Sequence, residues 1–380
     1  MSDIKTKLIN IEWLFVDQDH YDLIMIEIDQ AVREKCNVII FLALMDGFVA
    51  WDPKYWIPLI DKLDNACKKL GIQEIIFISG AGKTYEYGLK HTHYFYDWNM
   101  SVVKNAYKDY DNQIKDYNND ADKFLFLTGR SARPNRIGLM SKFYDENMLK
   151  NSTWSFFPPW NEIDNKWCRN YLSKYTDKEY NEFLKNCNRS LDSDNEYNSC
   201  KSFLGVYEGD NWHDIVKEPY IHNPSFIDLH HYNDVKLTVI SEGPIYWEWS
   251  NDRYYLTDKT YRELLMKKPV ILSGYVEQYK ELKNLGFKTF DENFLIKEYG
   301  LIEDEEQRLE AIVQNVKYFL NNSDYQKVKQ DVDFNTKLLY YYFKKQDEFL
   351  KYLETKYNAS KEEIEFFFNR KGLEHLIRKP

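Results

Sequence analysis

The residues from 37 to 78 decide the fold class of this chain. They read NVIIFLAL (37–44), WIPLIDKLDNACKKL (56–70) and EIIFI (74–78). Two short apolar runs thus flank an amphipathic stretch of helix length, and such runs are typical of strands buried on both faces of a parallel sheet. The same alternation begins earlier, with an apolar run at 11–16 and an amphipathic stretch at 21–34. We therefore predict a Rossmann-like α/β domain over residues 1–120.

A second α/β series follows a polar, linker-like stretch at 112–122. Strands are expected at 123–128, 153–157, 236–241, 269–273 and 288–290, and helices at 134–149, 259–266, 276–285, 305–321 and 336–357. Residues 160–235 are rich in Asn, Asp and Lys and are expected to form an irregular insertion. We predict a second Rossmann-like domain over 121–330 and C-terminal helices over 331–380. Two such domains are expected to face a cleft.

Composition excludes several classes of protein. A chain of 380 residues with 43% hydrophobic residues is too long for a single small binding module and can form packed cores. Its formal net charge of −10 argues against non-specific attraction to nucleic acid or anionic lipid. The longest apolar run, Val38 to Met45, is far shorter than the ~20 residues that cross a bilayer, and the first residues hold no apolar signal core. We expect a cytoplasmic protein with no membrane partner.

No metal site is predicted. The five cysteines are too far apart in sequence to form a zinc-type pair, and the close histidine pairs lack the spacing of a helical site. Several Asp-x-Asp pairs occur, but an acid-rich chain produces them by chance. The run SGAGKT at 79–84 resembles the end of a P-loop, yet Phe77 stands where that motif needs its first glycine. A turn at the end of a strand is the favoured interpretation there.

The stretch LFLTGRSARPNR at 125–136 predicts an anion site. A strand ends, a loop brings Arg130, Arg133 and Arg136 together, and Pro134 stands where a helix would begin. Guanidinium groups and unpaired backbone N–H groups at a helix N-terminus both favour a bound anion. Phosphate binding is the favoured interpretation, and the alternative is a solvated loop with ordinary helix-start chemistry.

A third stretch joins a strand ending at Ser241 to the segments RYYLTDKTYRELLM (253–266) and KPVILSG (268–274). Thr257 or Thr260 can cap the helix between them, and Thr260 with Glu263 fits a capping box. These caps do not account for Lys259, because a cation in the first turn opposes the helix dipole. A bound anion facing Lys259 would account for it.

The run YLTDKTYRELL (255–265), followed by KPVIL (268–272), resembles the nucleotide-sugar motif of the α-1,3-fucosyltransferase family. It is also similar to that motif in glycosyltransferase-like proteins of phages and giant viruses, which pair an arginine-rich loop with a segment like LGFKTF (285–290). The resemblance covers about residues 123–150 and 236–320. It implies a two-domain GT-B type fold and a nucleotide-diphosphate sugar as donor substrate, with no further cofactor.

The resemblance also implies donor-site residues. Lys259 is implied at the diphosphate, and Asp258 stands where the family has a glutamate that partners the ribose hydroxyls. Aspartate is one methylene shorter, so its reach to a ribose is less certain than that of glutamate. The expected donor site consists of Arg130, Arg133, Arg136, Glu242, Tyr255, Asp258 and Lys259.

The implied reaction is displacement at the anomeric carbon of the donor, with transfer of the sugar to an acceptor hydroxyl. Cationic groups and a helix N-terminus can neutralise the leaving diphosphate without a metal. The candidate for the group that takes the acceptor proton is Asp46, which follows the apolar run 37–44, although an aspartate stabilising the turn before Gly47 is an equal alternative. The acceptor stays open between a glycan, a protein and a hydroxymethylated DNA base. The alternative function is a non-catalytic viral α/β protein that serves in interaction or structure.

Overall fold

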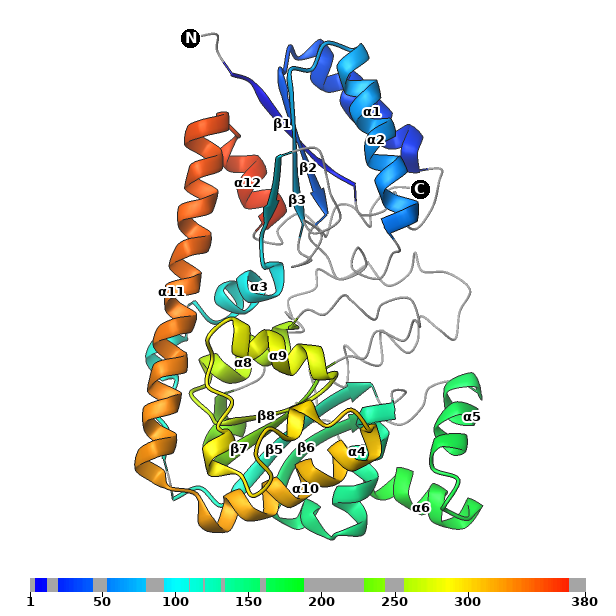
Figure 1. Cartoon of the computed structure of the whole chain (residues 1–380), viewed down its shortest axis with the longest axis vertical. Helices are drawn as coiled ribbons and strands as arrows, with labels where there is room; N and C mark the ends of the chain where they lie inside the picture. The colour runs from blue at the N-terminus through cyan, green and yellow to red at the C-terminus, as the bar shows by residue number, and fades with distance from the viewer. Residues whose placement is uncertain are drawn as a thin grey trace. The chain divides into compact units, whose positions relative to one another are not determined.

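The computed structural model describes residues 4–11, 20–43, 53–79, 92–108, 110–118, 120–130, 134–157, 162–187, 229–242 and 256–368. These residues form an α/β protein with two parallel sheets (Figure 1). The chain divides into two compact units. The first unit contains the described residues up to Asn105 and those from Tyr341 on, and the second contains the described residues from Ala106 to Tyr340.

The first unit holds a parallel sheet in the order β1-β2-β3-β4. Its elements are β1 (Thr6–Asn10), α1 (His20–Arg33), β2 (Val38–Ala43), α2 (Pro53–Lys69), β3 (Glu74–Ser79), β4 (Thr92–Phe95) and α3 (Trp98–Tyr107). The predicted alternation of strand and helix is confirmed from α1 to β3. The apolar run at 11–16 was expected to begin the sheet, but the first described strand, β1, lies before it, ends at Asn10 and pairs Thr6 with Val38. Residues 12–16 of that prediction lie outside the described residues.

Both faces of the first sheet are buried, as the continuous apolar runs predict. Ile39 and Phe41 of β2 point to the face that α1 and α2 cover. Val38 and Ile40 point to the opposite face, because successive strand residues alternate between faces. There they pack with α3 and with residues from the C-terminal end of the chain, including Leu353.

The last two described helices contribute to the core of the first unit from Tyr341 on. They are α11 (Tyr325–Tyr357) and α12 (Lys361–Phe368), and the described residues from Tyr341 on cluster with this unit. The Asn358 side chain donates a hydrogen bond to the carbonyl of Ile4 at 2.9 Å. Residues 341–368 are thus a covering layer of the first sheet, whereas the sequence predicted a separate helical part from 331.

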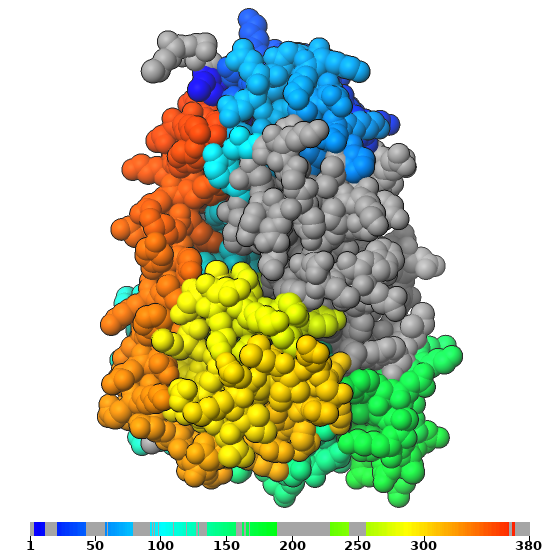
Figure 2. Space-filling model, viewed as in Figure 1, coloured from blue at the N-terminus to red at the C-terminus, as the bar shows by residue number. Residues whose placement is uncertain are grey.

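The second unit holds a parallel sheet in the order β6-β5-β7-β8. Its elements are β5 (Lys123–Arg130), α4 (Pro134–Asp145), β6 (Ser152–Phe157), α5 (Glu162–Tyr171), α6 (Asp177–Cys187), β7 (Val235–Ser241), α8 (Asp258–Leu265), β8 (Val270–Ser273), α9 (Val276–Asn284) and α10 (Glu305–Asn322). Short 3-10 turns complete it at Asp111–Gln113, Met148–Asn151, Leu229–Tyr232 (η7), Asp291–Asn293 and Tyr299–Leu301. In Figure 2 the yellow and orange side chains of this unit form a closed layer that hides the strands.

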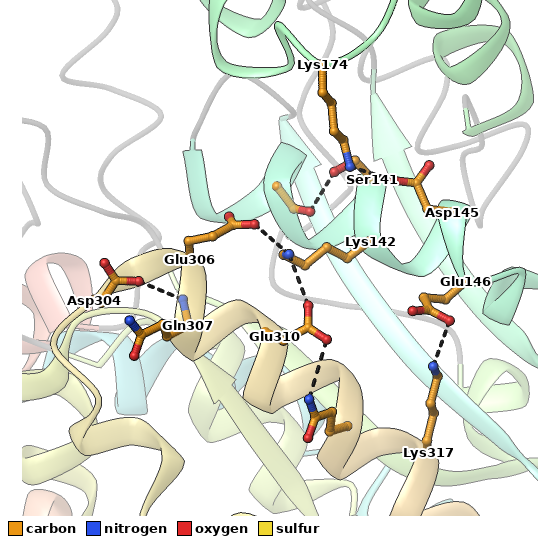
Figure 3. A network of polar contacts seen from close by, with 12 residues as sticks. Ser141, Lys142, Asp145, Glu146, Lys174, Asp304, Glu306, Gln307, Glu310 and Lys317 are labelled. Atoms are coloured by element: carbon orange, nitrogen blue, oxygen red, sulfur yellow. Dashed lines mark hydrogen bonds and ion pairs between the residues drawn. The ribbon is translucent and has the colours of Figure 1, made fainter.

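Helices α4 and α10 pack closely on one side of the second sheet. A Cβ atom at Gly138 would lie 2.8 Å from Leu309 Cδ1, so glycine permits this approach. At the rim, Lys142 Nζ pairs with Glu306 at 2.6 Å and with Glu310 at 3.2 Å (Figure 3). Burial alone would lower the pKa of Lys142, but the two carboxylates outweigh it and raise that pKa. The pairs therefore hold α4 and α10 together in the charged state of the lysine.

Three predictions from residue 160 on need correction. The strand predicted at 288–290 is absent from the described structure, because the Asn335 side chain accepts a hydrogen bond from Lys288 N at 2.7 Å and donates one to Lys288 O at 2.9 Å. That amide replaces a strand partner. The helix predicted at 336–357 begins earlier, at Tyr325. The region 160–235, predicted as irregular, contains α5, α6 and η7 among its described residues.

The described residues contain no helix that is both long enough and apolar enough to cross a membrane. Their four cysteines are Cys36, Cys67, Cys168 and Cys187, and each is a buried free thiol. Burial raises the pKa of Cys67 to about 12 and has the same effect on Cys187. These side chains pack as small apolar groups.

The covering role of α11 is testable with Leu353→Ala. Leu353 is fully buried against the first sheet, so we expect the variant to lose about 2–5 kcal/mol of unfolding free energy through lost burial and a residual cavity. Urea denaturation followed by circular dichroism measures this loss. Leu350→Ala, at a half-buried position on the same helix, should cost clearly less. Equal and small losses for both variants would contradict the covering role.

Candidate functional site

The strand order of the second sheet reverses between β5 and β7. Strand β5 leads through α4 to β6 on one side, whereas β7 lies on the other side of β5 and leads through α8 to β8. Right-handed crossovers that run in opposite directions place α4 and α8 on opposite faces of the sheet. Figure 1 shows α8 and α9 on one side of this sheet and α10 on the other. Ligands of doubly wound sheets bind outside the carboxyl ends of the strands at such a reversal. The carboxyl edge of β5, β7 and β8 is therefore the candidate functional site.

Asn135 ties the two sides of this reversal together. It is the second residue of α4, and its side-chain Nδ2 donates to the carbonyl of Glu242 at 2.9 Å and to that of Ser273 at 3.2 Å. The Ser241 hydroxyl lies 3.4 Å from the same nitrogen. Since Ser241 ends β7 and Ser273 ends β8, one buried amide fixes the start of α4 against two strand ends.

Glu242 fixes the start of α8. Its carboxylate is fully buried, and Oε1 accepts a hydrogen bond from Thr257 N at 3.0 Å and another from the Thr260 hydroxyl. Thr257 is the N-cap, with its hydroxyl accepting from Lys259 N at 3.3 Å. A carboxylate and a threonine cap therefore satisfy the first turn of this helix, where negative charge also suits the helix dipole.

Three buried polar atoms at this edge have no hydrogen-bond partner within the described part of the chain. They are Asn135 Oδ1, Glu242 Oε2 and Ser273 Oγ. Each belongs to a residue that is at least nine-tenths buried. Buried polar atoms in proteins are nearly always paired, so three such atoms at a strand-order reversal indicate a candidate site for a ligand.

The structure brings three of the predicted donor-site residues together. Glu242 holds the first turn of α8, which begins with Asp258 and Lys259, and the Lys259 ammonium lies 3.6 Å from the Asp258 carboxylate. Arg136 is buried in the first turn of α4, next to Asn135, rather than in a solvated loop. Arg130 ends β5, but its side chain lies outside the described residues. Asp46, Arg133 and Tyr255 also lie outside them.

Sequence reasoning missed Asn135 and Ser273, but of the two caps that it left open, Thr257 and Thr260, the first is confirmed. The N-cap of α8 is Thr257, and Glu263 does not complete a capping box with Thr260. Instead the Glu263 carboxylate accepts from Arg262 Nε and from Tyr232 Oη, both at 2.9 Å. The only available signal for Asn135 was a short polar side chain directly after Pro134, at a predicted helix start.

A cluster of buried charged residues lies within α8 and directly after it. The side chains of Arg262 and Glu263 are only 4% and 1% exposed. Burial raises the pKa of Glu263, although Arg262 beside it opposes that shift. Lys268 follows α8 and is also buried, and burial lowers its pKa to about 8, with Glu263 opposing this shift and Lys115 adding to it. The position of α8 therefore depends on charges that the protein holds away from water.

The bridging role of Asn135 is testable with Asn135→Ala. The substitution removes the donor that pairs the buried carbonyls of Glu242 and Ser273, so we expect a loss of about 1–3 kcal/mol of unfolding free energy in urea. Asn321→Ala, at an exposed position near the end of α10, should change stability by less than about 0.5 kcal/mol. An Asn135→Ala protein as stable as the parent would show that this tie contributes nothing.

Lys268 provides a test of the buried cluster through pH. Burial lowers the pKa of Lys268 from 10.5 to about 8, so this lysine binds its proton more tightly in the unfolded chain than in the folded protein. The group therefore contributes stability above pH 10.5, and that stability is lost as the pH falls through 8. We expect the free energy of unfolding of Lys268→Met, minus that of the parent, to be about 2 kcal/mol larger at pH 7 than at pH 9.5. Urea denaturation of both proteins at the two pH values measures this difference. A difference independent of pH would mean that Lys268 titrates normally.

No cluster of three or more potential metal-ligating His, Cys, Asp or Glu residues occurs among the described residues. No protein-family model, curated protein sequence or solved structure matches this chain. The function is therefore inferred from the residues gathered at the carboxyl edge of the second sheet.

Proposed function

We propose that this protein is a glycosyltransferase that binds a nucleotide-diphosphate sugar at the carboxyl edge of its second unit. The observation that carries the proposal is the first turn of α8 at the strand-order reversal, where Glu242, Asp258 and Lys259 come together. The motif 255–265, which resembles the nucleotide-sugar motif of α-1,3-fucosyltransferases, begins in this region. Two parallel α/β units are compatible with the GT-B type, and that finer arrangement is part of the proposal.

Lys259 is the proposed phosphate ligand. Its side chain is 28% exposed, and its nearest carboxylate, Asp258, lies at 3.6 Å rather than in a close hydrogen-bonded pair. An ammonium in the first turn of a helix is repelled by the positive end of the helix dipole. A bound diphosphate would interact favourably with the ammonium and with that end of the dipole. Arg136 in the first turn of α4 supplies a second cation at the same edge.

The proposed reaction is displacement at the anomeric carbon, with the diphosphate as leaving group. Lys259, Arg136 and the neighbouring arginines would stabilise the charge that develops on it. Asp46 is the proposed acceptor of the hydroxyl proton, supplied by the first unit. The acceptor is proposed to be a glycan, a protein or a hydroxymethylated base, and the net charge of −10 disfavours the last of these.

One observation favours the second candidate, a non-catalytic α/β protein. The buried Glu242 carboxylate already satisfies the start of α8, a place where a phosphate would otherwise be favoured. A scaffold would need no ligand at this edge.

Ligand binding separates the two candidates. A screen of nucleotide-diphosphate sugars by thermal unfolding should find one that raises the melting temperature, since a ligand at 100 times its Kd adds about 2.7 kcal/mol of stability. Lys259→Ala should weaken that ligand at least about tenfold in calorimetry, as expected for a lost charge-assisted hydrogen bond. Lys280→Ala, an exposed lysine on α9, is the control and should bind as the parent does. Unchanged affinity in Lys259→Ala would refute the site, and no shift with any donor would favour the scaffold.

A further inference from the structure

The unpaired atoms at the carboxyl edge form one cluster. The Asn135 amide bonds the carbonyls of both Glu242 and Ser273, and the Glu242 N–H donates to the Ser273 carbonyl at 2.9 Å. The three residues are therefore directly connected, and Asn135 Oδ1, Glu242 Oε2 and Ser273 Oγ are the atoms that these bonds leave unused. They lie where the strand order of the second sheet reverses.

The hydrogen-bonding capacity of these three atoms determines which class of ligand can bind them. An amide oxygen and a carboxylate oxygen can only accept hydrogen bonds, while the serine hydroxyl can accept or donate. A phosphate oxygen is itself an acceptor, so it cannot satisfy Asn135 or Glu242. Calcium takes 6–8 oxygen ligands, and this cluster supplies one carboxylate, one amide and one hydroxyl. Hydroxyl groups fit, since each donates one bond and accepts another.

The Glu242 carboxylate is held in place before any ligand arrives. Two donors from α8 fix Oε1, and Gly274 leaves room beside the side chain, since a Cβ there would lie 3.1 Å from Glu242 Cβ. The second oxygen therefore has a fixed position, which reduces the entropy lost when a ligand binds it.

We propose that Asn135, Glu242 and Ser273 bind two adjacent hydroxyl groups of a sugar. This inference rests on the proposed function, because the hydroxyls would be those of the ribose or of the transferred sugar in the donor. It assigns the cluster to sugar recognition and leaves the diphosphate to Lys259 and Arg136. It also differs from the sequence-based expectation, in which Asp258 was the partner of the ribose.

Glu242→Gln replaces the unused oxygen and removes the negative charge of the side chain. Both bonds from α8 go to Oε1, and glutamine keeps that oxygen while placing an NH₂ group where Oε2 was. An acceptor becomes a donor, so the variant should melt no lower than the parent but bind the donor about 10–100-fold more weakly. Glu277→Gln removes the same charge from the first turn of α9 and should bind as the parent does.

Calorimetry with defined probes distinguishes the two sources of hydroxyls. The probes are GDP, UDP, their 2′,3′-dideoxy analogues and the corresponding nucleotide sugars. If the ribose is bound, removing its hydroxyls weakens the diphosphate about as much as Glu242→Gln does. If the transferred sugar is bound, Glu242→Gln weakens only the nucleotide sugar, and the dideoxy diphosphate binds normally.

The outcomes also separate this inference from the proposed function. If Glu242→Gln binds every probe as the parent does, the inference is overturned, while the proposed nucleotide binding still stands. The unused atoms would then be assigned to an internal water. If no nucleotide binds the parent, the proposed function fails. Free monosaccharides at millimolar concentration then test the cluster itself, and no thermal shift that depends on Glu242 would overturn it.

Discussion

A parallel sheet must be covered on both faces, and this constraint shapes both units. In the first unit the strands bury side chains in both directions, and the connecting helices α1 and α2 cover only one face. The other face is covered by α3 and by residues 341–368, which return from the far end of the chain. In the second unit α8 and the α4–α10 pair cover opposite faces, which requires crossovers in both directions. The reversal between β5 and β7, where the candidate site lies, accompanies that coverage in the second unit, whereas residues returning from the end of the chain supply it in the first.

At the reversal, the groups that hold the fold are also the groups of the site. Asn135 uses its nitrogen to fix two strand ends, and Glu242 uses one oxygen to fix α8. Each retains one buried oxygen without a partner in the described structure. The proposed binding and the fold therefore use the same two side chains but different atoms, so an acceptor-to-donor change can separate them.

Much of the fold could be predicted because its central strands are continuous apolar runs. Strands β2, β5 and β7 lie where such runs were found. Strand β4 was missed because Thr92–Phe95 is short and carries polar residues at the sheet edge, where a partner is needed on one side only. The strand predicted at 288–290 was wrong because Asn335, 47 residues away from Lys288, takes its place as the hydrogen-bond partner. Pattern within one segment cannot reveal a partner at that distance.

The candidate site shows the same limit. Lys259 was singled out by its place at a predicted helix start and Glu242 by the family resemblance, since both signals are local in the sequence. The role of Asn135 could not be predicted, because its partners lie 107 and 138 residues further along the chain. The inward position of Arg136 was equally hidden, since a loop rich in arginine predicts solvated charges.

The identity of residue 242 is the last physical point. Its helix-capping bonds use a single oxygen, and glutamine would supply that oxygen without burying a charge. A buried carboxylate costs far more free energy than a buried amide unless donors compensate it on both oxygens. The described residues compensate only one. A ligand that donates hydrogen bonds to the second oxygen, as proposed above, would compensate the carboxylate on both oxygens.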